Sequence, residues 1–142
     1  MKELILALMV WASANTGLDV PETMPIIKNV SAETMFYMVQ PGQEYNPDRG
    51  VRWLALYAND VIYLQDTWQV DNLRDVSSLL HELVHHMQAY DADAEYRCRG
   101  KSEEVAYEAQ MDWLTAAGVD PYETIGMNKL FYMMVIMCNP HE

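Results

Sequence analysis

The chain has 142 residues and 51% of them are apolar, so it can bury a hydrophobic core of the size of one domain. Its formal net charge of -12 argues against nucleic acid as a partner, because binding phosphates needs patches of lysine and arginine. The charge also argues against an anionic membrane surface, and no apolar run is long enough to span a bilayer. We therefore expect a single domain over residues 1–142, kept soluble by its acidic surface.

The N-terminal segment has two interpretations. An apolar run from Leu4 to Ala12, followed by Ser13-Ala14, resembles a signal peptide with its cleavage site. Glu3 before this run and Trp11 at its end argue against a cleaved leader. We expect instead the first helix of the domain, ended by the turn-forming residues Asn15-Thr16-Gly17.

Short strands and one helix are predicted for the middle of the chain. Residues 26–30 form a strand candidate, and Ser31 is a suitable N-cap for a helix that reaches Gln40. Residues 53–57 and 61–64 alternate in hydropathy around Asn59-Asp60, which predicts a β-hairpin.

Three longer helices are expected in the second half. The first is capped by Asp71 or Asn72 and runs to Tyr90, and the second is opened by Ser102 and runs to Ala117. The last starts at Asp120-Pro121 and is rich in methionine. The chain therefore reads as an α+β fold, mostly helical, with a small sheet that includes a hairpin before the helix of residues 72–90.

That helix carries the pattern H-E-x-x-H as His81, Glu82 and His85. Residues four apart lie on one helix face about one turn apart, so the two histidines can bind one metal ion. Glu82 lies beside the pair, where it can act as a general base toward a metal-bound water but is poorly directed as a ligand. The pattern predicts a catalytic Zn2+ site.

The rest of the helix divides into two faces that agree with this prediction. Ser77 and Ser78 lie on the histidine side, where small residues leave room for a cleft. The opposite side is expected to face the core with Val76, Leu79, Leu80, Leu83, Met87 and Tyr90.

The neighbouring polar residues are given lesser roles. His86 points away from the pair and is expected to be satisfied at the edge of the core, and His141 is treated as uninvolved. Gln88 is either a hydrogen-bond partner of a ligand or an ordinary residue of the helix surface.

A third ligand must come from elsewhere, because a catalytic zinc usually has three protein ligands and one open position. Position 91 is Asp, so the third histidine of an extended H-E-x-x-H motif is absent and a metzincin is excluded. The helix opened by Ser102 carries Glu103, Glu104 and Glu108, and a glutamate from this helix would complete a His2Glu site.

The combination of H-E-x-x-H with a downstream glutamate helix resembles the gluzincin peptidases. In several gluzincin groups the second motif is E-x-x-A-D, and Glu103-Glu104-Val105-Ala106-Tyr107 matches it except for the last residue. The resemblance implies that Glu103 is the third ligand, with Glu104 as the second choice and Glu108 as the third. Tyr107 replaces an acid that orients a metal-binding histidine, so it either takes over that role, stabilises an oxyanion, or is a core residue.

The whole chain is also similar to a bacterial family of predicted zinc peptidases with a helix–strand–helix–hairpin order before the metal helix. The features that carry this resemblance are residues 14–18, residues 81–88, Ala106-Tyr107, Gln110 and Trp113-Leu114. It implies a minimal one-domain gluzincin outside the cytoplasm.

Cys98 and Cys138 are the two cysteines of the chain, and no C-x-x-C motif is present, which excludes a four-thiolate zinc site. If they form a disulfide, a periplasmic or secreted location is favoured, and if they are free thiols, a cytoplasmic one. Cys98 could alternatively close the zinc site as a fourth ligand.

The function expected from these residues is that of a zinc metallopeptidase acting on a peptide or protein substrate, which pairs with the hairpin edge near Tyr57, Ala58 and Asn59. One alternative is a zinc-binding module without peptidase activity. Another is an interaction protein that docks a partner through Met133, Met134 and Met137, although core packing is the ordinary explanation of such a stripe. The oligomeric state stays open.

Overall fold

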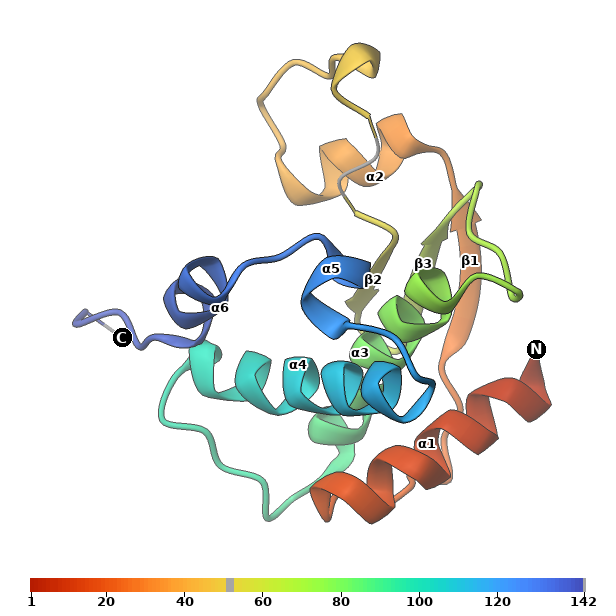
Figure 1. Ribbon diagram of the computed structural model, residues 1–142, viewed down its shortest axis with the longest axis vertical. Helices are drawn as coiled ribbons and strands as arrows, with labels where there is room; N and C mark the ends of the chain where they lie inside the picture. The colour runs from red at the N-terminus through yellow and green to blue at the C-terminus, as the bar shows by residue number, and fades with distance from the viewer. Residues whose placement is uncertain (51–52, 142) are drawn as a thin grey trace.

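The computed structural model describes residues 1–50 and 53–141 (Figure 1). In these ranges the chain forms six α-helices, one short 3-10 helix and a three-stranded sheet, which confirms the predicted α+β class. No helix in the described ranges has the length and apolar character needed to cross a bilayer.

Helix α1 (Lys2–Thr16) is part of the folded domain, as expected for the first helix. It ends at Gly17, whose φ of 79° lies in the left-handed region that glycine adopts at little cost. Its apolar run contributes Ile5, Leu8, Met9 and Ala12 to the buried core. Figure 1 shows α1 at the opposite end of the molecule from α2.

The sheet has the order β1-β3-β2, with β1 (Ile26–Val30) parallel to β3 (Val61–Gln65) and β2 (Ala55–Ala58) antiparallel to it. Asn59 and Asp60, with φ values of 49° and 68°, form the tight turn of the predicted hairpin. Strand β2 begins at Ala55, two residues later than predicted. Because β2 pairs with β3 alone, its outer edge is unpaired within the described residues.

The connection between β1 and β2 contains α2 (Ala32–Val39) and the 3-10 helix η1 (Pro47–Arg49). Ser31 caps α2 as predicted, since its side chain accepts a hydrogen bond from the backbone N–H of Thr34.

Helix α3 (Leu73–Tyr90) carries the H-E-x-x-H motif and lies at the centre of the core. Asn72 caps it, accepting a hydrogen bond from the backbone N–H of Asp75. The expected apolar face is buried except at Tyr90, where the prediction was wrong. Tyr90 is 43% exposed and its hydroxyl donates to Asp60 at 2.8 Å, because the helix end projects beyond the core.

Helix α4 (Arg99–Ala116) packs along α3 and begins three residues earlier than predicted. Ser102 lies inside its first turn, where its hydroxyl donates to the carbonyl of Arg99. Cys98 takes the N-cap position without a capping side-chain hydrogen bond, and it is tied to Cys138 by a disulfide. The helix start is therefore set by a tertiary constraint instead of a capping side chain.

The predicted last helix is in fact two helices, α5 (Pro121–Ile125) and α6 (Lys129–Ile136). Gly126, with a φ of 79°, ends α5, and the side chain of Asn128 caps α6. The expectation that the methionines pack in the core was also wrong. Met133 is 59% exposed, and Met134 and Met137 are each 64% exposed. Helix α6 buries no residue because it lies at the edge of the molecule, against the start of α4 (Figure 1).

Candidate metal centre

The packing of α3 against α4 brings together His81, His85 and Glu103 (Figure 1 shows the two helices). His81 Nε2 lies 3.2 Å from Glu103 Oε2, and His85 Nε2 lies 2.8 Å from Glu103 Oε1. One ligand atom from each residue lies within 4.8 Å of the other two. Two imidazoles and one carboxylate at this separation match the donor set of a catalytic zinc site.

Two observations show that a metal cation fits these residues. His85 Nε2 is buried and makes no well-aligned hydrogen bond within the described residues, although the Glu103 carboxylate is close. Burial raises the pKa of Glu103, but the neighbouring imidazoles of His81 and His85 outweigh burial and hold this pKa well below its usual range. The carboxylate is therefore ionised, and its oxygens lie across short gaps from the Nε2 atoms of both histidines.

A glutamine from α4 orients the first histidine. Gln110 Oε1 lies 3.0 Å from His81 Nδ1, and Gln110 Nε2 donates to the hydroxyl of Ser77 at 3.1 Å. Since the amide nitrogen is engaged with Ser77, the oxygen faces the ring and His81 Nδ1 carries the proton. This leaves the Nε2 lone pair of His81 directed toward Glu103.

A second glutamine orients the other histidine. Gln88 Oε1 lies 2.8 Å from His85 Nδ1, and Gln88 Nε2 donates to the carbonyl oxygen of Ser102 at 3.0 Å. Gln88 is therefore held between two hydrogen-bond partners, one of which is His85. Both histidines thus have the same tautomer, with Nε2 free to bind a metal.

Glu82 lies beside the three ligand residues without joining their group. Burial raises the pKa of Glu82, while the neighbouring His81, His85 and the backbone of Tyr57 lower it, and the net direction is upward. A carboxylate with a raised pKa at the wall of a cavity has the properties of a general base.

Tyr107 packs its ring edge-on against His81, with the ring centroids 4.4 Å apart. Burial, reinforced by the charge of Glu103, raises its pKa to about 12, so the hydroxyl stays protonated. No hydrogen bond joins this hydroxyl to His81 within the described residues, and the ring nitrogen that it would orient is bonded to Gln110. The last residue of the E-x-x-A-D motif would be an acid that orients a histidine, and here Tyr107 replaces it. Gln110, one turn further along α4, contacts His81 in its place.

The other predicted candidates lie outside the centre. Glu104 pairs with Lys101 at 3.0 Å, and Glu108 lines a separate cavity near Asn15. His86 is fully buried between the hydroxyl of Tyr57 and the carbonyl of Thr23, as expected for a satisfied core histidine. His141 is exposed in the C-terminal tail.

Three cavities meet over Glu82 and together form a groove along the start and edge of β2. Their volumes are about 150, 380 and 430 Å³. The smallest is bordered by Ser78 and His81, the middle one by His81 and Glu103, and the largest by His85 and Glu103. The centre is therefore open to molecules larger than water. Ser77, expected beside this cleft, is instead buried under Gln110.

Cys98 and Cys138 form a disulfide. The sulfur of Cys98 is bonded to Cys138, so the suggestion that it closes the site as a thiolate ligand was wrong. The bond joins the start of α4 to the segment after α6, and Val135 and Met137 from this region line the middle cavity. The disulfide thus secures one wall of the groove.

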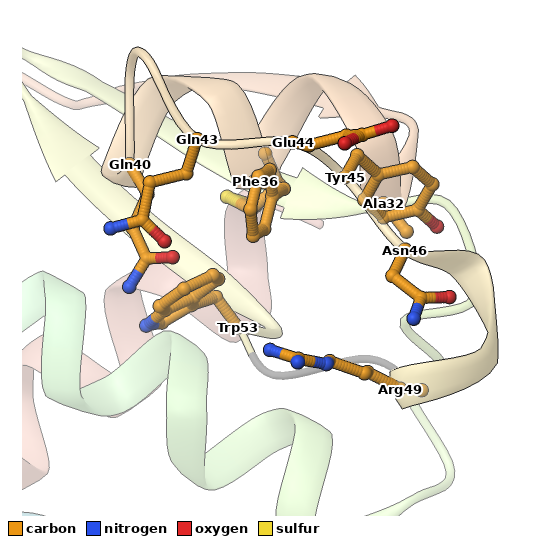
Figure 2. Close-up of a pocket in the computed structure, with 11 residues that line it drawn as sticks. Ala32, Phe36, Gln40, Gln43, Glu44, Tyr45, Asn46, Arg49 and Trp53 are labelled. Carbon is orange, nitrogen blue, oxygen red and sulfur yellow. The ribbon is translucent and has the colours of Figure 1, made fainter.

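A further cavity of about 40 Å³ lies on the other side of Trp53 (Figure 2). Phe36 contacts both Tyr45 and Trp53, with ring centroids 5.5 and 6.2 Å apart. Figure 2 shows Gln40 and Arg49 at the edge of this aromatic cluster. The cavity is too small for more than a few waters, and the ring of Phe36 supports Trp53 from this side.

Sequence reasoning missed the roles of Gln110, Arg74 and Trp53 at the groove. Gln110 had a usable signal, because it lies seven residues after Glu103 and so on the same face of α4 two turns later. Arg74 lies seven residues before His81 on α3 and had the same signal. Trp53 had none, since it precedes its strand and reaches the groove through the tertiary fold.

Comparison with known proteins gives one match. No curated protein and no solved structure matches the chain. Residues 1–141 match the family described as "Domain of unknown function (DUF6647)", a description that names no activity. Because this match covers nearly the whole chain, the protein belongs to the DUF6647 family.

Proposed function

We propose that the protein is a zinc-dependent hydrolase, specifically a metallopeptidase with a His2Glu zinc site. The observation that carries the proposal is the convergence of His81, His85 and Glu103 at the wall of an open groove, with Glu82 beside them. Three protein ligands with space next to them are typical of catalytic zinc, whereas structural sites are closed by four.

In this proposal each residue has a defined task. His81, His85 and Glu103 hold the ion, and their orientation is maintained by Gln110 and Gln88. When bound, zinc supplies Lewis acidity toward a carbonyl oxygen and lowers the pKa of water.

The remaining steps belong to side chains that line the groove. Glu82 accepts a proton from the attacking water and returns it to the leaving amine. The protonated hydroxyl of Tyr107 donates a hydrogen bond to the oxyanion that develops at the scissile carbonyl.

The unpaired edge of β2 supports a peptide as the substrate. Leu54 and Ala55 border the smallest cavity, and Leu56 and Tyr57 border the largest, so the strand follows the length of the groove. An extended peptide can add to this edge through backbone hydrogen bonds, which hold it beside Glu82.

A non-catalytic zinc module is the weaker alternative. Its clearest version needed Cys98 as a fourth ligand, and Cys98 is bonded to Cys138. The disulfide also supports a location in an oxidising compartment, periplasmic or extracellular, since such bonds persist there.

The proposal is tested by the zinc content of purified protein, measured by elemental analysis on wild type, Glu103→Ala and Glu104→Ala. We expect about one zinc per chain in the wild type and in Glu104→Ala, and loss of zinc in Glu103→Ala. The two variants form a matched pair, because Glu104 is adjacent in sequence but faces Lys101. Zinc retained in both variants, or absent from the wild type even after zinc is added, would reject the site.

A further inference from the structure

The groove has two unequal ends. Beyond Glu82 on one side it opens into the cavity of about 430 Å³, and on the other it narrows to about 150 Å³. The narrow end is bordered by Trp53 and by Ile125. Ile125 is the last residue of α5, and this helix packs on both α3 and α4. An extended peptide that enters from the wide end therefore finds little room beyond the metal centre.

Trp53 is a firm boundary for this narrow end. Its ring lies beside that of Phe36, with the ring centroids 6.2 Å apart (Figure 2). Trp53 borders the small cavity next to Phe36 and also the narrow and middle cavities of the groove. An aromatic side chain supported from behind keeps its position when a ligand binds.

Among the described residues, Arg74 is the arginine or lysine that borders the narrow cavity. It lies four residues before Ser78 and seven before His81, so the three share one face of α3. Arg74 is exposed and forms no ion pair within the described residues. The carboxylate of the adjacent Asp75 is turned inward, where it accepts from the backbone N–H of Gln69 at 2.9 Å.

We propose that Arg74 binds the C-terminal carboxylate of the substrate, so that the protein acts at the C-terminal end of peptides. This rests on the proposed peptidase function and names its substrate class. A guanidinium group suits a carboxylate because it can donate two parallel hydrogen bonds to it.

The direction of β2 supports the same assignment independently. The strand begins at Ala55, which borders the narrow cavity. It continues through Leu56 and Tyr57, which border the wide cavity, and ends at Ala58. A peptide paired antiparallel to β2 runs the opposite way, so its C-terminus arrives at Arg74. Antiparallel pairing is the slightly more stable arrangement.

The reaction is the addition of one water to the last peptide bond held at the centre. The carbon–nitrogen bond breaks, the hydroxyl stays on the carbonyl carbon as part of a new carboxylate, and the proton passes through Glu82 to the leaving amine. The products are the shortened peptide and the C-terminal fragment. The narrow cavity favours a fragment of one small residue.

The test compares two peptides of identical sequence, one with a free C-terminal acid and one with a C-terminal amide. Binding is measured by calorimetry on zinc-loaded Glu82→Gln protein, which keeps its metal ligands and does not consume the peptide. We expect the acid to bind about 10- to 100-fold more tightly than the amide, the range for losing a hydrogen-bonded charge pair.

Variants in the same background assign the preference to one side chain. Arg74→Ala should bind acid and amide equally, and Arg74→Lys should keep part of the preference because it keeps the charge. Arg97→Ala is the control, since Arg97 is exposed and borders none of the three cavities. Equal binding of acid and amide before Arg74 is changed, or a preference that survives Arg74→Ala, would overturn the assignment.

Hydrolysis by wild-type protein separates this proposal from the one on which it rests. Release of C-terminal residues from the acid peptide alone supports both. Equal cleavage of acid and amide peptides, or cleavage at internal bonds, supports the peptidase proposal and rejects the role of Arg74. If zinc is bound and no peptide is cut, the peptidase proposal fails, and the binding comparison still decides whether Arg74 selects a carboxylate.

Discussion

At the scale of single residues, the candidate site divides into what helix geometry determines and what tertiary packing adds. His81, Glu82 and His85 follow from the H-E-x-x-H spacing, because a helix places residues four apart on one face. Glu103 was expected only from the resemblance to gluzincins, since no local rule states which glutamate of the next helix faces the histidines. The partnership of Gln110 with His81 went unpredicted, because it depends on the register between α3 and α4.

The first prediction at this scale concerns Glu82. Glu82→Gln should retain one zinc per chain, because Glu82 is not among the three ligand residues. The same variant should lose peptide hydrolysis by about 10²- to 10⁴-fold, the usual contribution of a general base. Zinc content and the rate of cleavage of a fluorogenic peptide measure the two effects. Wild-type activity in Glu82→Gln would reject the role of Glu82.

The second prediction concerns Gln110. Gln110→Leu removes the hydrogen bond that sets the tautomer of His81, so zinc affinity should fall by about 10- to 100-fold. Competition with a fluorescent zinc chelator measures this affinity. Gln43→Leu is the matched control, because Gln43 is exposed and lies away from the metal centre. Equal affinity in the two variants would show that Gln110 does not hold the histidine.

At the scale of elements, the sequence located most helices and strands, and the errors had two causes: a boundary set by a tertiary contact, and local caps that were overlooked. The cap residues Ser31 and Asn72 and the turn Asn59-Asp60 act through local hydrogen bonds or backbone conformation, so they could be recognised in advance. The start of α4 is set by Cys98 and its bond to Cys138, which no local signal reveals. The final helix was divided by Gly126 and Asn128, whose capping signals were overlooked in an apolar segment.

A prediction for an element follows from the contact between the start of α4 and the end of α6. A Cβ atom added at Gly100 would lie 2.5 Å from the carbonyl oxygen of Met137 and 2.6 Å from that of Ile136. Both contacts are with backbone, so Gly100→Ala must displace the end of α6. We expect a loss of about 1–3 kcal/mol in the free energy of unfolding, the usual cost of overpacking.

Urea denaturation measures this loss. Lys101→Ala is the control from the same turn of α4, and as an exposed surface substitution it should change stability by no more than about 0.5 kcal/mol. If Gly100→Ala is as stable as the control, the close packing of α4 on the end of α6 is disproved.

At the scale of the whole molecule, the fold separates the metal centre from the wall that shapes its groove. All three candidate ligands lie on α3 and α4, which pack against each other and share the core with α1. The side of the groove formed by Val135 and Met137 belongs to a C-terminal segment whose helix buries no residue. Most of its apolar side chains are exposed, so the hydrophobic effect contributes little to holding this segment in place.

The disulfide is therefore expected to matter for the groove more than for the metal. Cys98 and Cys138 are 40 residues apart, and closing a loop of this length in the unfolded chain stabilises the native state by about 4 kcal/mol in the chain-entropy model. The double variant Cys98→Ser/Cys138→Ser should lose up to this amount in urea denaturation and still bind one zinc, because no ligand lies on the released segment. Its KM for peptides should rise more than its kcat falls, since the wall is lost and Glu82 stays in place. Loss of zinc on removing the disulfide would show instead that the C-terminal segment supports the ligands themselves, and the division between centre and wall would be wrong.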